Sequence, residues 1–245
     1  MCRILLLFIL GILLPFVVEA KEVRVAFGQS VPPYIIQDSN SGIEMDIIRE
    51  ALAYKGHKLI PVYVTFSNIT SSFIDKNVDA VATVNDKIGM DGYFSDVVIT
   101  YKNYAITLAS NKLKINSIND LRKGKVSAFQ LATRYLGNEY ATAVLENPDY
   151  REKQDQIIHV KLLYDNQVDA VITDKAIFQY YTRKLKNKIS THQDVTYHQI
   201  FPWNDYKTIF RDKVLRDDFN EGLKNLRTSG RYKKIFVEYL GNDEK

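Results

Sequence analysis

The sequence predicts an α/β fold made of two similar lobes. One short phrase occurs twice, ninety residues apart, as Asn77-Val-Asp-Ala-Val-Ala-Thr83 and Gln167-Val-Asp-Ala-Val-Ile-Thr173. Valine and alanine runs of this length suit a strand that is covered on both faces. Strand and helix patterns alternate around each copy, which is typical of a parallel sheet with crossover helices. Because ligands bind at the carboxyl ends of such strands, two similar strand ends suggest one ligand held between two lobes.

The first twenty residues have the pattern of a secretory signal peptide. Arg3 gives a positive start, residues 4–18 are apolar and uncharged, and residues 18–20 suit a signal peptidase. The alternative is a transmembrane anchor, but this run is shorter than the roughly 20 apolar residues that a span needs. A lipoprotein is disfavoured because Cys2 precedes the apolar run. We therefore expect cleavage before Lys21 and a periplasmic location.

The mature chain is expected to contain no cysteine, because Cys2 is the only one in the sequence. Disulfides, cysteine nucleophiles and thiolate metal sites are thereby excluded. The net charge of +4 is unchanged by cleavage, since Arg3 and Glu19 leave together. The basic residues are scattered, as on solvated helix faces, so we expect no nucleic-acid partner. A chain of about 225 residues can bury a sufficient core without disulfides.

The first half of the chain follows a strand–helix–strand–helix–strand order. The segment Val31-Pro32-Pro33-Tyr34 predicts a rigid extended turn, because each proline restricts the residue before it. Gly56 is well placed to end the first helix, and Pro61 indicates an edge or a bulge in the second strand. The elements expected before the first repeat strand are strand 23–27, helix 45–55, strand 59–64 and a short helix over 69–75.

The same order restarts in the second half. We expect a strand at 125–129, a helix at 132–145, a short helix or strand-like segment at 156–164 and, after the second repeat strand, a helix at 175–186. The apolar run 104–109 would carry the chain to the second lobe, and 196–201 would carry it back. Leu215, Phe219, Leu223 and Leu226 have helical spacing, and another helix is expected after Gly230.

Several further motifs occur in a fixed order. They are Pro32-Pro33-Tyr34, Gly42-Ile-Glu44-Met-Asp46, the first Val-Asp-Ala-Val, Tyr93-Phe-Ser-Asp96, Ile118-Asn-Asp-Leu-Arg-Lys-Gly-Lys125, the second Val-Asp-Ala-Val with Asp174, and Phe219-Asn-Glu-Gly-Leu223 followed by Ser229-Gly-Arg-Tyr-Lys-Lys-Ile235. In this order, the chain from about residue 23 to 241 resembles the bacterial extracellular solute-binding proteins of the polar amino-acid type, family 3. These proteins are the periplasmic partners of ABC transporters.

The resemblance implies the type II periplasmic-binding-protein fold. Each lobe would be a mostly parallel sheet flanked by helices, and two hinge strands would join the lobes. The first lobe would combine residues 21–105 with 198–245, and the second would span 106–197. A small polar ligand, such as an amino acid, an amine or a related metabolite, would be captured in the cleft by hinge closure. The implied partner is a membrane permease or sensor, and we expect a monomer.

No catalytic or metal-binding signature stands out. His57, His159, His192 and His198 are dispersed without metal-ligand spacing, so we expect a binding protein without metal or cofactor. One alternative is an exported dehydratase of the cyclohexadienyl dehydratase type on the same fold, with Glu44 or Asp174 as general acid or base. Another is a ligand-sensing module for a membrane receptor.

The resemblance places three candidate ligand contacts in the first lobe. Tyr34 matches the family's ligand-stacking aromatic, and Phe66 matches its second aromatic. Packing into the core is the alternative for both. Glu44 matches an acidic position near the cleft, but it would also suit the start of a helix at Met45, where a carboxylate offsets the helix dipole.

Asp174 is the most specific ligand-binding candidate in the second lobe. It matches the family aspartate that pairs with a ligand ammonium group, and a dry carboxylate needs a cation or several donors. The alternative is an N-cap for the helix from Lys175, and both roles can coexist.

The chain also departs from the family pattern at two places. The family arginine after the first repeat strand is missing, which leaves Thr83, Asn85 and Lys87 as the polar candidates there. The glycine of the family's glycine-threonine turn is replaced, although Thr133 and Arg134 could still donate from a helix start, and Phe129 adds an aromatic wall. These departures favour a cationic, amine-bearing or aromatic ligand over an α-amino acid held in the usual way.

Overall fold

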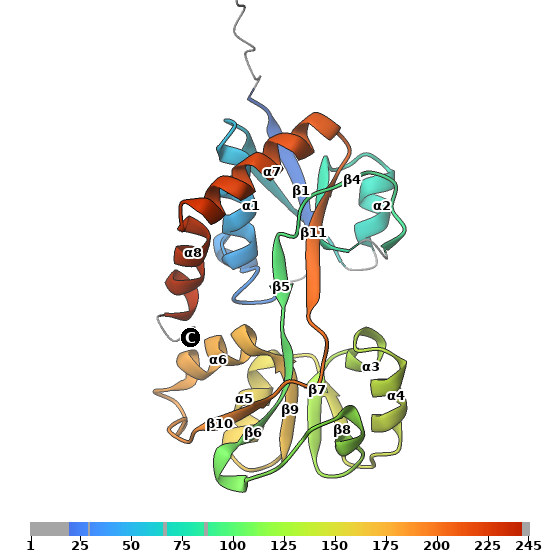
Figure 1. Cartoon of the computed structure of the whole chain (residues 1–245), viewed down its shortest axis with the longest axis vertical. Coiled ribbons are helices and arrows are strands. Elements are labelled where there is room, and N and C mark those ends of the chain that lie inside the picture. Colours follow the sequence, from blue (N-terminus) through green and yellow to red (C-terminus); the bar gives the residue numbers. More distant parts are fainter. Residues whose placement is uncertain (1–19, 29, 66–67, 86–87, 242–245) are drawn as a thin grey trace, which may run out of the picture.

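The structure is a computed structural model that describes residues 20–28, 30–65, 68–85 and 88–241. It has two α/β lobes stacked along the long axis and joined by two chain crossings (Figure 1). Each lobe contains one sheet flanked by helices, which confirms the predicted two-lobed fold. Within these described ranges, the search for a helix long and apolar enough to cross a membrane finds none.

The first lobe is built on a six-stranded sheet of order β2-β1-β3-β11-β4, in which β5 also pairs with β11. Strand β1 pairs in parallel with β2 and β3, while β11 runs antiparallel to β3, β4 and β5. The strands are β1 (Glu22–Phe27), β2 (Lys58–Tyr63), β3 (Ala80–Val84), β4 (Tyr93–Phe94), β5 (Ile99–Tyr101) and β11 (Asn204–Phe210). The helices are η1 (Gln37–Ser39), α1 (Ile43–Ala53), α2 (Ile69–Ile74), α7 (Lys213–Thr228) and α8 (Arg231–Leu240).

The second lobe is built on a five-stranded sheet of order β10-β6-β9-β7-β8. Strand β7 pairs in parallel with β8 and β9, and β6 runs antiparallel to β9 and β10. The strands are β6 (Asn103–Leu108), β7 (Val126–Phe129), β8 (Tyr150–Lys153), β9 (Ala170–Asp174) and β10 (Val195–His198). The helical segments are η4 (Ala109–Asn111), η5 (Ile118–Arg122), α3 (Ala132–Tyr135), α4 (Asn138–Leu145), α5 (Gln156–Tyr164) and α6 (Lys175–Leu185).

The repeated phrase forms equivalent strands in the two sheets. The orders β2-β1-β3-β11 and β8-β7-β9-β6 correspond, so β3 and β9, the two copies, lie at the same place in each lobe. Each repeat strand has one antiparallel neighbour, β11 beside β3 and β6 beside β9. Both of these neighbours begin directly after a crossing between the lobes. Each sheet is therefore mixed rather than mostly parallel, because the crossing strands run against the parallel set.

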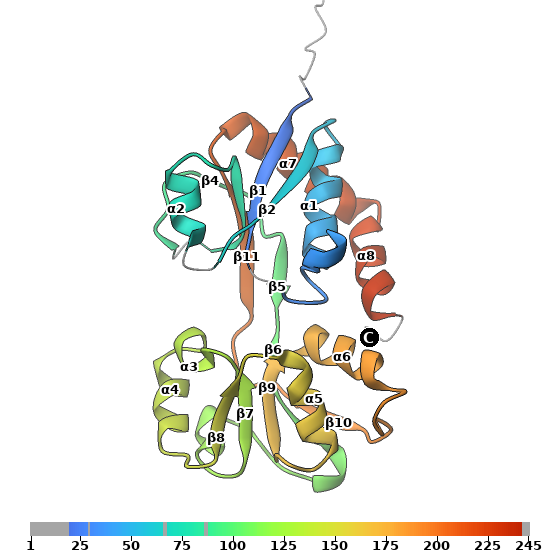
Figure 2. The same cartoon turned by 180° about the vertical axis from the view of Figure 1, so that it is seen from behind.

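The chain crosses between the lobes a few residues away from the predicted runs. Run 104–109 was expected to be the outgoing connection, but it lies in β6, where Ala105, Ile106 and Leu108 are fully buried. Run 196–201 likewise overlaps β10. The crossings lie just before β6 and just before β11 (Figure 2). Burial explains the difference for run 104–109, since an apolar run is more stable inside a sheet than across an open junction. The lobe boundaries at residues 105 and 198 stay a prediction.

The structure differs from the sequence prediction in one helix, over 132–145, and shows which secondary structure segment 156–164 adopts. The helix expected over 132–145 is two helices, α3 and α4, separated at Gly137. Gly137 has a φ of 91°, a conformation that side-chain-bearing residues rarely adopt, so the helix cannot run through it. The segment 156–164 is a helix, α5. Strand β2 lies at the edge of its sheet, as Pro61 indicated.

Candidate functional site

The turn after β1 presents Tyr34 to the junction between the lobes. It is a tight turn instead of the extended one expected, because Val31 and Ile35 bridge each other and the Tyr34 N–H donates to the Val31 carbonyl at 2.9 Å. The Glu44 N–H at the start of α1 donates to the Tyr34 carbonyl at 3.1 Å. A Cβ on Gly42 would lie 2.3 Å from that carbonyl oxygen, so only glycine allows this close approach.

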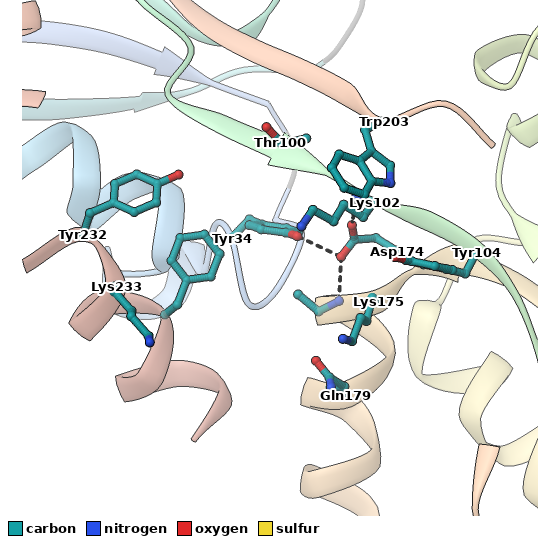
Figure 3. Close-up of a pocket in the computed structure, with 12 residues that line it drawn as sticks. Tyr34, Thr100, Lys102, Tyr104, Asp174, Lys175, Gln179, Trp203, Tyr232 and Lys233 are labelled. Carbon is teal, nitrogen blue, oxygen red and sulfur yellow. Dashed lines mark hydrogen bonds between the residues drawn. The ribbon is translucent and has the colours of Figure 1, made fainter. Parts of the chain in front are cut away.

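Tyr34 contacts Asp174 across the two lobes. Its hydroxyl donates to Asp174 Oδ1 at 2.8 Å (Figure 3). The same carboxylate caps α6, since Oδ1 also accepts the N–H groups of Ala176 at 2.8 Å and Ile177 at 3.2 Å. Asp174 Oδ2 accepts the N–H of Lys102 at 2.6 Å. The capping role is therefore confirmed. Three of the four donors share Oδ1 and one is on Oδ2, so Oδ2 keeps one lone pair for a further donor.

Burial of Asp174 raises its pKa to about 6, although its hydrogen bonds from Lys102, Tyr34 and the α6 amides favour the charged form. Its side chain is almost inaccessible to water. The group is therefore a desolvated carboxyl whose charge is stabilised by its hydrogen-bond donors.

Glu44 joins the same network from the first turn of α1, which begins two residues before the predicted start. Thr83 Oγ1 donates to Glu44 Oε1 at 2.9 Å, and the Tyr101 hydroxyl donates to Oε2 at 3.2 Å. Complete burial raises the pKa of Glu44 to about 7 despite these hydrogen bonds. The Tyr101 ring stacks on Tyr34 with 4.1 Å between centroids. A continuous chain of contacts thus runs from Thr83 to Asp174, through both lobes.

A cavity of about 390 Å³ lies beside this network, between α6 and α8 (Figure 3). Its walls come from the outgoing crossing, the returning crossing and both helices. Its lining residues include Tyr34, Lys102, Asp174, Lys175, Trp203, Tyr232, Lys233 and Phe236. Of the predicted site residues that the structure describes, only Tyr34 and Asp174 line this cavity.

The second-lobe candidates near α3 lie apart from this cavity. Thr133 donates its N–H and its hydroxyl to Glu152 Oε1, both at 3.0 Å, and the Leu131 N–H donates to Glu152 Oε2 at 2.6 Å. Of the two residues predicted to hold a ligand anion, Thr133 therefore binds a carboxylate of the chain itself, and the Arg134 N–H donates to the Leu131 carbonyl at 2.9 Å. Arg134 is exposed, and Phe129 packs against the second-lobe core.

The remaining candidates belong to the first lobe. Asn85 directly follows β3 and is half-buried. Phe66 and Lys87 lie outside the described residues. In the part of the chain that the structure describes, no group of three or more histidine, cysteine, aspartate or glutamate side chains is placed to hold a metal ion.

Residue-by-residue reading of the sequence missed Tyr101, Lys102 and Trp203. All three lie at the crossings between the lobes, which the sequence placed a few residues away. Trp203 is the only tryptophan, and it is half exposed at the edge of the cavity. Its place two residues after segment 196–201, which was expected to carry the chain back to the first lobe, is the one sequence signal near it.

Comparisons with known proteins agree with this architecture. The "Probable histidine-binding protein" of Neisseria gonorrhoeae is 25% identical over 235 residues, covering 91% of this chain and 84% of that protein. An ancestral amino acid-binding protein described as a precursor of cyclohexadienyl dehydratase is 20% identical, with a TM-score of 0.63 and coverage of 89% and 95%. A histidine kinase sensor domain is also 20% identical, with a TM-score of 0.65 and coverage of 90% and 96%.

These two structures share the fold. The model of one family matches nearly the whole described chain, from residue 23 to 242. The chain belongs to the bacterial extracellular solute-binding proteins, family 3.

Proposed function

We propose that this protein is a periplasmic solute-binding protein that captures a small polar molecule between its lobes. The observation that carries the proposal is the buried network from Thr83 to Asp174, which spans both lobes beside a cavity at the crossings. A ligand in that cavity would touch both lobes and both crossings. Such shared contacts are what hinge closure requires, because only they favour the closed state over the open one.

The ligand class that the relatives support is an amino acid or a related metabolite. One relative is named for histidine binding and another for amino-acid binding. The bound ligand would then be presented to a membrane transporter. Presentation to a receptor is supported by the likeness to a histidine kinase sensor domain.

A thermal-shift screen of the mature chain, residues 21–245, tests the proposal. Amino acids, amines and small carboxylic acids would be added one at a time, since a ligand that binds only the folded protein raises its melting temperature. At 100 times the Kd the gain is roughly 2.7 kcal/mol. Trp203 gives a second readout, because a ligand in the cavity would change the fluorescence of the only tryptophan. A panel that changes neither signal would contradict solute binding.

Acid–base catalysis is a second candidate, supported by one observation. Glu44 and Asp174 are buried in the same interlobe network with pKa values of about 7 and about 6, which suit proton transfer near neutral pH. A dehydratase would remove water and carbon dioxide from a cyclohexadienyl acid such as prephenate, and ultraviolet absorbance detects the aromatic product. Turnover that Glu44→Gln abolishes would favour the enzyme, whereas binding without turnover would favour the carrier.

A further inference from the structure

The cavity between α6 and α8 carries an excess of positive charge. Lys102, Lys175 and Lys233 contribute their side chains, whereas Asp174 is the one carboxylate among its described lining residues. Asp174 already accepts four hydrogen bonds from the chain itself, three on Oδ1 and one on Oδ2. Among the described residues, the salt bridges include none of these three lysines. The cavity therefore has three cationic side chains against one carboxylate, and that carboxylate already has donors from the chain.

Aromatic rings hold two of the ammonium groups in place. Lys102 Nζ lies 4.4 Å from the centre of the Trp203 ring, and Figure 3 shows both side chains beside the Tyr34–Asp174 contact. Lys175 Nζ lies 5.5 Å from the centre of the Tyr197 ring. A cation held over a ring face keeps its N–H donors for another partner, because the ring consumes no carboxylate.

Aromatic rings form much of the remaining cavity wall. Trp203 is half exposed on the returning crossing, and Tyr232 and Phe236 face the cavity from α8. A volume of about 390 Å³ is within the range of small-molecule sites. Aromatic rings can stack on a planar apolar group, and the nearby ammonium groups attract an anionic group. The cavity therefore suits a molecule that carries both.

We propose that this cavity binds a small organic anion with a planar apolar part, such as an aromatic or unsaturated carboxylate. Lys102 and Lys175 receive the carboxylate, and the rings of Trp203 and Phe236 cover the planar part. The inference rests on the proposed solute-binding function and names its ligand class. It replaces the ligand ammonium group expected at Asp174, because an entering cation meets three like charges and a single carboxylate that four donors of the chain already stabilise.

Three compounds that share a phenyl ring separate the alternatives. They are 3-phenylpropionate, which has only the acid, 2-phenylethylamine, which has only the amine, and phenylalanine, which has both. Calorimetry and Trp203 fluorescence on the mature chain would rank their affinities, and we expect 3-phenylpropionate to bind most tightly. Tighter binding of the amine or of phenylalanine overturns the anion assignment but leaves solute binding intact. Failure of these compounds and of the whole screening panel overturns both.

Lysine variants test which groups receive the anion. Lys102→Gln and Lys175→Gln should each weaken 3-phenylpropionate binding by about tenfold or more, since each removes a charge-assisted hydrogen bond. Lys224→Gln removes the same charge from an exposed position on α7, far from the cavity lining, and serves as the matched control. If all three variants weakened 3-phenylpropionate binding equally, the net charge of the protein alone would explain the effect, and the assignment of Lys102 and Lys175 as the anion site would be wrong. Circular dichroism confirms that each variant is folded.

Discussion

At the scale of single residues, Glu44 and Asp174 are two buried carboxyls that face no ion-pair partner among the described residues. Both carboxyls are buried where the lobes meet, and burial raises the pKa of each towards neutrality. Among the described residues, neither has a cationic side chain as a hydrogen-bond partner, and each accepts hydrogen bonds from uncharged donors instead. Protonation of these carboxyls is therefore linked to stability near physiological pH.

Glu44→Gln should reduce the pH dependence of stability. Because the pKa of Glu44 is raised from 4.5 to about 7, the folded protein holds a proton that the unfolded chain has already released. The stability contributed by this group is complete below pH 4.5 and is lost as pH rises towards 7. The free energy of unfolding, measured with urea across that interval, should fall less in the variant than in the natural protein.

Two details sharpen the Glu44 experiment. Asp174 shifts in the same direction, from 3.8 to about 6, so part of the pH dependence should persist in the Glu44 variant. Glu139→Gln is the matched control, since Glu139 also lies in the first turn of a helix but is exposed. If Glu44→Gln and Glu139→Gln gave the same slope, the raised pKa of Glu44 would be wrong.

At the scale of elements, the aspartate of each repeated phrase has the same structural task. Asp79 Oδ2 accepts the N–H of Arg24 in β1 at 2.9 Å, and Asp169 Oδ2 accepts the N–H of Lys125, just before β7, at 2.7 Å. In both lobes the aspartate thus aligns the start of the central parallel strand with the repeat strand. The repetition in the sequence reflects this shared strand pairing. The polar contacts at the ends of the two repeat strands differ, since Thr83 donates to Glu44 and Asp174 accepts from Tyr34.

The packing of α7 on α1 depends on one glycine. A Cβ on Gly222 would lie 2.0 Å from the Ala51 carbonyl oxygen, so the two helix backbones touch there. The apolar stripe of α7, including Phe219 and Leu223, is buried in the first-lobe core as a result.

Gly222→Ala should therefore destabilise the first lobe by roughly 1–3 kcal/mol, because the added methyl group forces the helices apart. Urea unfolding followed by circular dichroism measures the loss. Lys224→Ala, two residues along the same helix and exposed, should change stability by less than about 0.5 kcal/mol. An alanine at position 222 that leaves stability unchanged would show that α1 and α7 do not pack so closely.

At the scale of the whole molecule, the lobes are joined on the α6 side. The first-lobe core includes Ala176 and Ile177 of α6, and α6 also contacts α8. Figures 1 and 2 place α2 and α4 on the opposite side of the crossings, each on a different lobe. Closure about the crossings would consequently change the separation of α2 and α4 more than that of α6 and α8.

Spin labels on α2 and α4 would measure this closure. Ile74→Cys and Leu145→Cys change exposed residues, 66% and 86% accessible, and Cys2 is the only natural cysteine. A ligand identified by thermal shift should shorten the distance between the two labels, as measured by electron–electron double resonance. Ile74→Cys with Val214→Cys, both in the first lobe, is the control pair whose distance should stay constant. An unchanged distance between the lobes at saturating ligand would contradict hinge closure.

Hydrophobic periodicity and short motifs are local properties of the chain, so they were enough to predict the two-lobed fold, most element positions and the family. They also gave Tyr34 and Asp174 as separate candidates. The contact between these residues, 140 positions apart, and the binding of Glu152 by the amides near Thr133 emerge from the folded chain alone. The tertiary structure likewise brought Lys102 and Trp203 to one cavity. The physical reason is that such contacts depend on where two crossings and two lobes meet, which no local pattern encodes.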